Sequence, residues 1–584
     1  MTMHLSTLDW GIIAAYMLIS LGIGLWFSRR GSKNLMEYFV AGRDVTWWLA
    51  GISMVATTFA ADTPLVVAKI VRTQGLIGNW IWWSGVMGAM VCVYYFAALW
   101  RRANIITDAE FMELRYAGGR GAFLRGFYAF FRSIFCNSVI LGWVILAMYK
   151  IVYTLLGWPK VASTWILVSV SVGYIFFSGL WGVLATDLFQ FVLAMAGCVI
   201  LAVIVMSDAG GPAALVTKAV ETCRAYAGQG TGLVDPTQVM NIFPNAESSQ
   251  LVVLTFVALI TLQWWQGAQG DGFMAQRLFS CKNEKHSLLS VLFYGFLHYA
   301  VRPWPWIIIG LGSIVYFPSL ADPEMAFPSM MVKFLPSGLR GMLVAAFFAA
   351  FMSTVSTHIN LGASYLVSDI YKRFIKKDAP DRHYVVVSWF AILLMTVLAG
   401  LTCLLMKSVY SAWLLGMALM SGPAIIFLLR WYWWRINAWS EITALVTAIV
   451  STMGLMLFSG LKDEAQYPQR LFIIIVVSTA VAVLVTLLTK PEPMEHLEKF
   501  YRRVRPGGWW GPVAERCPDV EKIAAPGGVT FLNWLLSVAC VYSVMFGLGW
   551  LIFGFIWKGA LALLLFAVLL TVVLKRIERV KFGV

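Results

Sequence analysis

Residues 51–64 read Gly51-Ile-Ser-Met-Val-Ala56-Thr57-Thr58-Phe59-Ala-Ala-Asp62-Thr63-Pro64, and they lie inside an apolar run that is long enough to cross a bilayer. Proline has no N–H to donate, and it disfavours helical geometry in the residue before it. The stretch therefore predicts an interrupted membrane helix, in which the backbone carbonyls from Ala56 to Ala60 are free to bind a cation. A proline kink whose gap is filled by threonine side chains is the alternative that this stretch leaves open.

The composition of the whole chain indicates a membrane protein. Of its 584 residues, 60% are hydrophobic and only 12% are charged, whereas about 25% of the residues in an ordinary soluble domain are charged. Basic loops beside a membrane account for the net charge of +15, so we expect no nucleic acid as a partner. The eight cysteines are scattered and form no close pair, so neither a disulfide framework nor a zinc site is indicated.

Fifteen apolar runs along the chain are long enough to be membrane helices. The first, over residues 10–28, is followed and not preceded by basic residues, so we interpret it as a retained span instead of a signal peptide. The predicted organisation is one span and a cytoplasmic loop in 1–45, five spans in 46–206, an external loop in 207–250, five spans in 251–433, two spans in 434–489, a cytoplasmic loop in 490–530 and two spans in 531–584. Two sets of five spans fit the inverted halves from which many secondary transporters are built.

Basic residues indicate how these spans are oriented. When alternate loops are assigned to alternate sides of the membrane, thirty of the 44 lysines and arginines fall on one side, nine on the other and five within spans. Because cytoplasmic loops carry the excess of lysine and arginine, the N-terminus is expected outside and the C-terminus in the cytoplasm. We expect an integral protein of a bacterial inner (plasma) membrane.

A second polar patch, residues 350–360, reads Ala350-Phe-Met-Ser353-Thr354-Val-Ser356-Thr357-His358-Ile-Asn360. At about 100° per residue, Ser353, Ser356 and Thr357 share one face of a helix, and Thr354 lies next to that face. Neutral hydroxyl oxygens suit a hard cation such as Na⁺. The alternative is that these hydroxyls join neighbouring helices or bond to the preceding turn.

A third patch places Asp187 one turn into the apolar helix expected over residues 181–206. A carboxylate in lipid is costly unless it has a partner. A cation bound beside the hydroxyls of the second patch would be one such partner. A salt bridge to Lys150 or Arg132 would be the structural alternative.

These three patches, together with three further motifs, resemble the sodium/solute symporter family over most of residues 8–490. The further motifs are Asp108-Ala-Glu110-Phe111-Met-Glu113-Leu-Arg115-Tyr116 after the third span, Gln276-Arg277 after the seventh and Asp369-Ile370-Tyr371-Lys372-Arg373 closing the ninth. The resemblance implies an all-α polytopic membrane protein with a five-plus-five inverted-repeat core of the leucine-transporter type, extended by N- and C-terminal spans. It also implies Na⁺-coupled symport, in which a small polar organic solute is taken up by alternating access. The solute is expected midway between the first and sixth core helices, which are both interrupted.

The coupling ion implied by the resemblance is Na⁺, in two sites. The first site is implied for three backbone carbonyls and two hydroxyls, those of Ala56, Phe59, Ala350, Ser353 and Thr354. The second is implied for one carboxylate and three hydroxyls, those of Asp187, Ser353, Ser356 and Thr357.

Departures from the sugar-transporting members of that family leave the solute open. Those members carry a Glu-Gln pair where this chain has Asp62-Thr63. We expect an aromatic and amide-rich cavity, beside a second helix interruption marked by the glycines at 267, 270 and 272. The candidate solute-binding residues are Asp62, Thr63, Trp82, Trp83, Gln263, Trp264, Gly267 and Asp271. Tryptophan stacks on sugar rings and attracts amines, so a sugar-like solute, an amino acid and an amine stay open, and an interfacial belt is the structural alternative for these tryptophans.

Other classes of function have less support. An enzyme would need clustered histidine, cysteine or carboxylate side chains, and the six histidines are spread along the chain. The expected partners are the solute, Na⁺ and the lipid bilayer, and no obligate protein partner is implied. The alternative is a proton-coupled transporter of the same fold, in which Asp187 or Asp62 exchanges protons.

Overall fold

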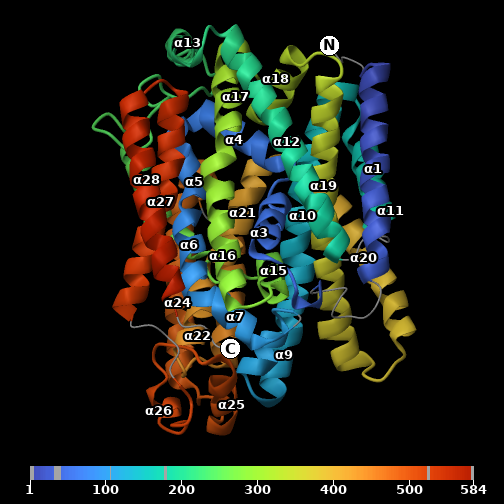
Figure 1. Cartoon of the computed structure of the whole chain (residues 1–584), viewed down its shortest axis with the longest axis vertical. Helices are drawn as coiled ribbons and strands as arrows, with labels where there is room; N and C mark the ends of the chain where they lie inside the picture. Colours follow the sequence, from blue (N-terminus) through green and yellow to red (C-terminus); the bar gives the residue numbers. More distant parts are fainter. Residues whose placement is uncertain are drawn as a thin grey trace.

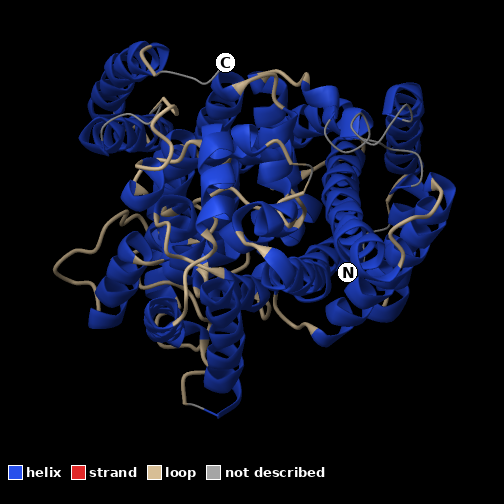
Figure 2. Cartoon of the chain, turned by 90° about the horizontal axis from the view of Figure 1, so that it is seen from below, coloured by secondary structure: helices blue, strands red, loops and turns tan. Residues whose placement is uncertain are grey.

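The computed structural model describes residues 5–31, 41–105, 107–175, 180–458, 460–521 and 527–580, and these residues form helices and connecting loops without a β-strand. Most helices run along the long axis of the molecule (Figure 1), and the end-on view shows them packed side by side (Figure 2). The start of α1 (Thr7–Gly31) and α13 (Pro212–Ala225) lie at one end, whereas α25 (Met494–Val504) and α26 (Gly511–Ala514) lie at the other.

Ten helices in the described residues are long and apolar enough to cross a membrane, or eleven when one bent pair counts as a span. The predicted all-α polytopic membrane fold is therefore confirmed. Three shorter apolar helices, Thr7–Ile19, Lys160–Ser171 and Gln250–Trp265, lie where the sequence predicts further spans. The total of fifteen spans and the proposed domain boundaries stay predictions.

Two sets of helices follow one another along the chain. The first set contains η1 (Ala41–Arg43), α3 (Trp47–Thr57), α4 (Asp62–Gln74), η2 (Leu76–Asn79), α5 (Trp80–Trp83), α6 (Gly85–Val91), η3 (Cys92–Phe96), α7 (Ala97–Ala103), α8 (Glu110–Arg115), α9 (Gly118–Phe130), η4 (Phe131–Asn137), α10 (Ser138–Leu156), α11 (Lys160–Ile175) and α12 (Leu180–Asp208). The second set, after α13, contains α14 (Gln250–Thr261), η5 (Gln263–Trp265), α15 (Phe273–Ser280), α16 (Glu284–Gly295), η6 (Phe296–Val301), α17 (Pro303–Tyr316), η7 (Pro323–Met325), α18 (Ala326–Phe334), α19 (Leu339–Ser364), η8 (Tyr365–Ile375), α20 (Asp381–Leu405), α21 (Val409–Ser421) and α22 (Ala424–Tyr432). The remaining helices are α23 (Ala438–Phe458), η9 (Glu464–Gln466), α24 (Tyr467–Leu488), α25, α26, α27 (Gly527–Ile552) and α28 (Ile556–Glu578).

The first interruption predicted from the sequence is confirmed. Helix α3 ends at Thr57, α4 begins at Asp62, and the two axes are bent by 63°. Pro64 falls in the first turn of α4, where a backbone N–H has no partner within the helix. Each half stays helical, and at the break the carbonyls of Thr57 and Thr58 accept hydrogen bonds from the side chains of Thr354 and Thr63.

The second interruption lies between α14 and α15, and glycine conformation explains it. Gly267, Gly270 and Gly272 have φ angles of 67°, 72° and 62°. This left-handed region is strained for residues that carry a Cβ atom. Helix α14 ends at Thr261, the 3₁₀ turn η5 follows, and the three glycines then separate it from α15, which begins at Phe273.

Helix α19 runs through the interior and packs against α12, α3 and α10. In the most apolar 18-residue stretch of the span Leu339–Ile375, 89% is buried inside the protein. The corresponding share for α28, at the edge of the molecule, is 11%. A helix that is enclosed on all sides can carry hydroxyl groups only if they find partners. The polar patch of residues 353–357 is therefore held in the core, beside the first interruption.

Candidate functional site

The first interruption and helix α19 meet through the hydroxyl of Thr354. It donates hydrogen bonds to the carbonyl of Thr57 at 3.1 Å and to that of Ala350 at 3.0 Å. The carbonyl of Ala56 accepts a bond from the N–H of Phe59 at 3.0 Å, which tightens the last turn of α3. Because the hydroxyl of Thr354 on α19 bonds to the carbonyl at the end of α3, oxygens of the two helices lie in the same buried region.

All five residues implied for the first ion site lie in this region and are buried: Ala56, Phe59, Ala350, Ser353 and Thr354. A group of carbonyl and hydroxyl oxygens without a carboxylate suits a monovalent hard cation. In the described part of the chain, no cluster of three or more histidine, cysteine or carboxylate side chains could hold a transition metal.

Asp187 joins three helices next to this region. Its carboxylate accepts hydrogen bonds from Ser53 on α3 at 2.7 Å and from Ser353 on α19 at 2.5 Å. The guanidinium of Arg277, from α15, lies 3.3 Å from the hydroxyls of both Ser53 and Thr57. Arg277 also attracts Asp187 electrostatically without forming an ion pair. The carboxylate is thus satisfied by hydroxyls and by a nearby cation.

Of the other second-site residues, Ser356 donates to the carbonyl of Ser353 at 3.0 Å. The hydroxyl of Thr357 is buried and has no hydrogen-bond partner among the residues that the structure describes. A buried hydroxyl without a partner is costly, and a bound ion would supply one. The structure therefore brings Asp187 and Ser353 into contact and leaves one oxygen of the proposed set free.

The structural alternative for Asp187, a salt bridge to Lys150 or Arg132, is wrong. Lys150 forms ion pairs of 2.6 Å with both Asp322 and Glu324, in the segment that joins α17 to α18. Arg132 pairs with Asp271 at 2.9 Å. Apolar periodicity does not show which charges meet across the bundle, so these pairings were not visible in the sequence.

A cavity of about 380 Å³ opens beside the first interruption. Five of the eight candidate solute-binding residues line it, namely Asp62, Thr63, Trp82, Gln263 and Trp264. Asp62 accepts a hydrogen bond from the indole of Trp413 at 2.9 Å. The cavity therefore combines aromatic surface with a few polar groups, which is typical of small-molecule sites.

The other three candidates lie outside the cavity wall. Trp83 is fully buried and packs edge-on against Phe546, with ring centroids 5.8 Å apart. Gly267 forms the turn after η5, and the carboxylate of Asp271 is held by Arg132. These residues shape the surroundings of the cavity, and the structure does not bring them to its surface.

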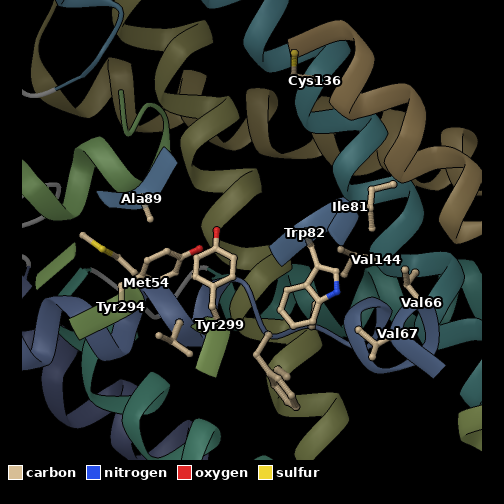
Figure 3. Packing of buried hydrophobic residues seen from close by; sticks show 14 of the residues in the cluster. Met54, Val66, Val67, Ile81, Trp82, Ala89, Cys136, Val144, Tyr294 and Tyr299 are labelled. Carbon is tan, nitrogen blue, oxygen red and sulfur yellow. The ribbon is translucent and has the colours of Figure 1, made fainter. Parts of the chain in front are cut away.

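Several cavity residues were not among the candidates, and four of them lie between the end of α16 and the start of α17. His298, Tyr294, Tyr299 and Arg302 line the cavity. Trp82 stacks on Tyr299 with ring centroids 6.2 Å apart, and Figure 3 shows the ring of Tyr294 on the other side of Tyr299. Arg302 was recognisable as an arginine inside an apolar span, which was the signal available in the sequence.

Polar contacts tie these residues to the interruption. The hydroxyl of Thr58 lies 3.0 Å from Nδ1 of His298 and accepts a hydrogen bond from Arg302 at 3.1 Å. Arg302 also donates to the carbonyl of Val55 at 3.0 Å. The broken end of α3 is therefore fixed by side chains that also face the cavity.

A second cavity, of about 480 Å³, adjoins the first, and Ile81 lines both. The first is called the inner cavity and the second the outer cavity. The wall of the outer cavity includes Lys69, Asp235 and Glu464, with Lys69 and Glu464 paired at 3.1 Å. The hydroxyl of Tyr467, which lines this outer cavity, donates to Gln263 of the inner cavity at 2.6 Å. The side chain of Tyr467 thus links the two cavities by a hydrogen bond.

Comparison with known proteins gives concordant findings. The model of the sodium:solute symporter family matches residues 38–450. Sodium/glucose cotransporter 4 of Danio rerio is 23% identical, over 87% of this chain and 81% of its own length. The sodium/glucose cotransporter of Vibrio parahaemolyticus is 26% identical, over 76% of this chain and 84% of its own. A solved Na⁺-coupled sialic acid symporter, in a substrate-bound outward-open state, matches 84% of this chain and 99% of its own at 21% identity, with a TM-score of 0.65.

Proposed function

The chain belongs to the sodium:solute symporter family, and from this premise we propose that it takes up a small polar organic solute by alternating access, driven by the Na⁺ gradient. It is an integral membrane protein of a family that couples transport to Na⁺ and that is not enzymatic. The proposed solute site is the inner cavity, midway between the interruption at α3–α4 and that at α14–α15.

The observation that carries this proposal is the shared wall between the ion region and the cavity. Thr57 and Thr354 line the cavity, and the same two residues are joined by the hydrogen bond that holds α19 to the broken end of α3. An ion bound at that junction would change the shape and the charge of the cavity wall. A solute would in turn stabilise the ion-bound geometry, since coupling between two sites is reciprocal.

Two Na⁺ sites are proposed. The first uses the carbonyls of Ala56, Phe59 and Ala350 with the hydroxyls of Ser353 and Thr354. The second uses Asp187, Ser353, Ser356 and Thr357, and the unpartnered hydroxyl of Thr357 supports it. Ser353 belongs to both sets, so occupancy of one site affects the other.

The solute site is proposed to use Asp62, Thr63, Trp82, Gln263 and Trp264 at the cavity wall, with Trp83, Gly267 and Asp271 supporting them from behind. A sugar-like solute, an amino acid and an amine are the candidate classes. The N-terminus is proposed to lie outside a bacterial plasma membrane and the C-terminus in the cytoplasm, because of the distribution of basic residues.

Proton coupling through Asp187 or Asp62 is the second candidate. It is favoured by one observation: both carboxylates are buried, and neither forms an ion pair among the described residues. A carboxylate in that position could carry a proton instead of stabilising Na⁺.

The test is transport by the full-length protein in liposomes. Sugars, amino acids and amines are supplied in turn under an inward Na⁺ gradient at equal pH, and then under an inward proton gradient without Na⁺. We expect the solute to accumulate under the Na⁺ gradient. Under the proton gradient we expect no more solute to accumulate than in protein-free liposomes. Accumulation under the proton gradient alone would instead assign the coupling to protons.

A further inference from the structure

Arg302 is a buried arginine at the wall of the inner cavity. Five arginines are among the largest fully buried side chains of the described residues, namely Arg72, Arg115, Arg277, Arg302 and Arg430. Of these five, only Arg302 lines the cavity. A charge within the membrane region is expensive unless it is paired, and such residues commonly mark a ligand site.

One edge of the Arg302 guanidinium has no partner in the described part of the chain. Nη1 donates to the carbonyl of Val55 and to the hydroxyl of Thr58. Within the described residues, Nε is buried without a hydrogen bond, Nη2 makes none either, and no carboxylate lies within ion-pair distance of the guanidinium. The rings of Trp306 and Phe59 lie 5.1 Å and 5.8 Å from the guanidinium carbon. The backbone and the aromatic rings therefore hold the group, while the edge formed by Nε and Nη2 stays free.

The other four buried arginines differ in this respect. Arg277 uses all three of its nitrogens, Arg72 uses both terminal nitrogens on backbone carbonyls, and Arg430 pairs with Glu441 at 3.1 Å. Arg115 donates through Nε to the carbonyl of Arg430 in α22 and through Nη2 to carbonyls that follow α22. Each of these four arginines therefore has at most one guanidinium nitrogen without a hydrogen bond. Arg302 has two such nitrogens, Nε and Nη2, and they lie on the same edge of the guanidinium.

The free edge has the shape that binds a carboxylate. Two neighbouring N–H groups of a guanidinium match the two oxygens of a carboxylate in a bidentate pair. The carboxylate of Asp62 lies in the same cavity and attracts Arg302 electrostatically, but it is held by Trp413 beyond ion-pair distance. Opposite charges that line one cavity without meeting leave room for a solute group between them.

We propose that the solute carried by this protein bears a carboxylate, and that Arg302 binds it through Nε and Nη2. The inference rests on the proposed function and narrows the solute class. The carboxylate has two possible sources. In an amino acid the ammonium group faces Asp62, whereas in a sugar acid the hydroxyl groups face Asp62 and Thr63, and the ring stacks on Trp82.

The test is binding to the purified full-length protein in saturating Na⁺, followed by thermal unfolding. The probes are matched pairs that differ at the carboxylate: glucuronate and glucose, galacturonate and galactose, and a set of amino acids with their methyl esters. We expect the acid of at least one pair to raise the unfolding temperature and to bind at least tenfold more tightly than its partner, or about 1.4 kcal/mol. A sugar acid or an amino acid that binds identifies the source of the carboxylate.

Variants separate binding from folding. Arg302→Gln is expected to weaken binding of the acid at least tenfold, and Arg302→Lys, which keeps the charge but not the paired edge, to weaken it less. The matched control is Arg72→Lys, at a buried arginine away from the cavity, which should leave acid affinity unchanged. Stabilisation by Na⁺ alone in each variant shows that the protein is folded and that the ion site works.

Three results would overturn the inference: a neutral partner that binds as tightly as its acid, unchanged affinity in Arg302→Gln, or no stabilisation by any acid of the panel. The proposed Na⁺ coupling fails separately, through loss of the Na⁺ response in the wild-type protein.

Discussion

Ser353 donates a hydrogen bond of 2.5 Å to the carboxylate of Asp187, and this contact joins α19 to α12 beside the first helix interruption. Ser53 on α3 donates to the same carboxylate. Three helices thus share one charged group. An ion that takes Ser353 as a ligand must reorganise this contact, so ion binding acts directly on the packing of the three helices.

The first prediction concerns the proposed ion site on α19. Ser353→Ala and Thr354→Ala each remove one of about five oxygen ligands. We expect each to raise the Na⁺ concentration for half-maximal stabilisation or uptake by roughly tenfold, or about 1.4 kcal/mol. The measurement is Na⁺ titration of unfolding temperature and of transport.

The matched control is Ser364→Ala, on the same helix, because the hydroxyl of Ser364 bonds only to the carbonyl of Leu361 at 2.9 Å. Its Na⁺ dependence should equal that of the wild type. Unchanged Na⁺ dependence in both test variants would mean that the hydroxyl cluster serves packing alone.

Local chemistry made part of this structure predictable from the sequence. Pro64 and the hydroxyls before it predicted the first interruption, and Gly267, Gly270 and Gly272 predicted the second, because each limits backbone geometry on its own. Five of the eight solute candidates line the cavity, and four of these five, Asp62, Thr63, Gln263 and Trp264, lie at or next to those interruptions. Such features depend on neighbours within a few residues.

Contacts between distant helices could not be predicted in the same way. Thr58 meets His298 and Arg302 across some 240 positions of sequence, and no periodicity encodes that meeting. Trp83 follows Trp82 directly and yet packs on Phe546 and does not line the cavity, because consecutive helix residues point about 100° apart. Residue type alone did not distinguish these two tryptophans.

A second prediction addresses the number of coupling ions. With two Na⁺ per solute, the wild-type protein should show a Hill coefficient for Na⁺ above one. Asp187→Asn should bring it toward one, because the second proposed site loses its charge. Charge and solute flux measured together in liposomes check the stoichiometry. A wild-type coefficient of one together with a one-to-one flux ratio would contradict two ions and leave Arg277 as the cation that balances Asp187.

A third prediction concerns pH and the segment between α17 and α18. Burial alone would raise the pKa of Glu324, but the ammonium of Lys150 and hydrogen bonds from Tyr410 and Ser408 hold this pKa below its ordinary value. A carboxyl whose pKa is lowered by folding stabilises the protein above its unfolded pKa of about 4.3, and this stability is lost as the pH falls through the lower folded value. Unfolding temperatures at pH 7 and below pH 4 measure the effect.

Glu324→Gln should lower stability at pH 7 by about 3 kcal/mol, because it leaves part of a buried ion pair unmatched, and should reduce the loss of stability at acid pH. Asp322→Asn is the control, since Asp322 contacts the same lysine but is 46% exposed, and it should cost less than about 1 kcal/mol. Equal effects of the two substitutions would contradict the role given to burial.

The last prediction tests the cavity through Asp62. This residue begins α4 at the interruption and faces the cavity, where an anion has access to a solute that it would lack in lipid. If the solute presents an ammonium group to Asp62, Asp62→Asn should abolish solute binding, because the amide has no charge to offer. If the solute presents hydroxyl groups, the amide still forms hydrogen bonds, and the loss of binding free energy should be about 1–3 kcal/mol.

In both cases stabilisation by Na⁺ should persist, since the proposed ion ligands are other oxygens. Asp235→Asn, in the outer cavity, is the control and should change neither quantity. Loss of the Na⁺ response with solute binding intact would assign Asp62 to the ion site and contradict the proposed division of the cavity.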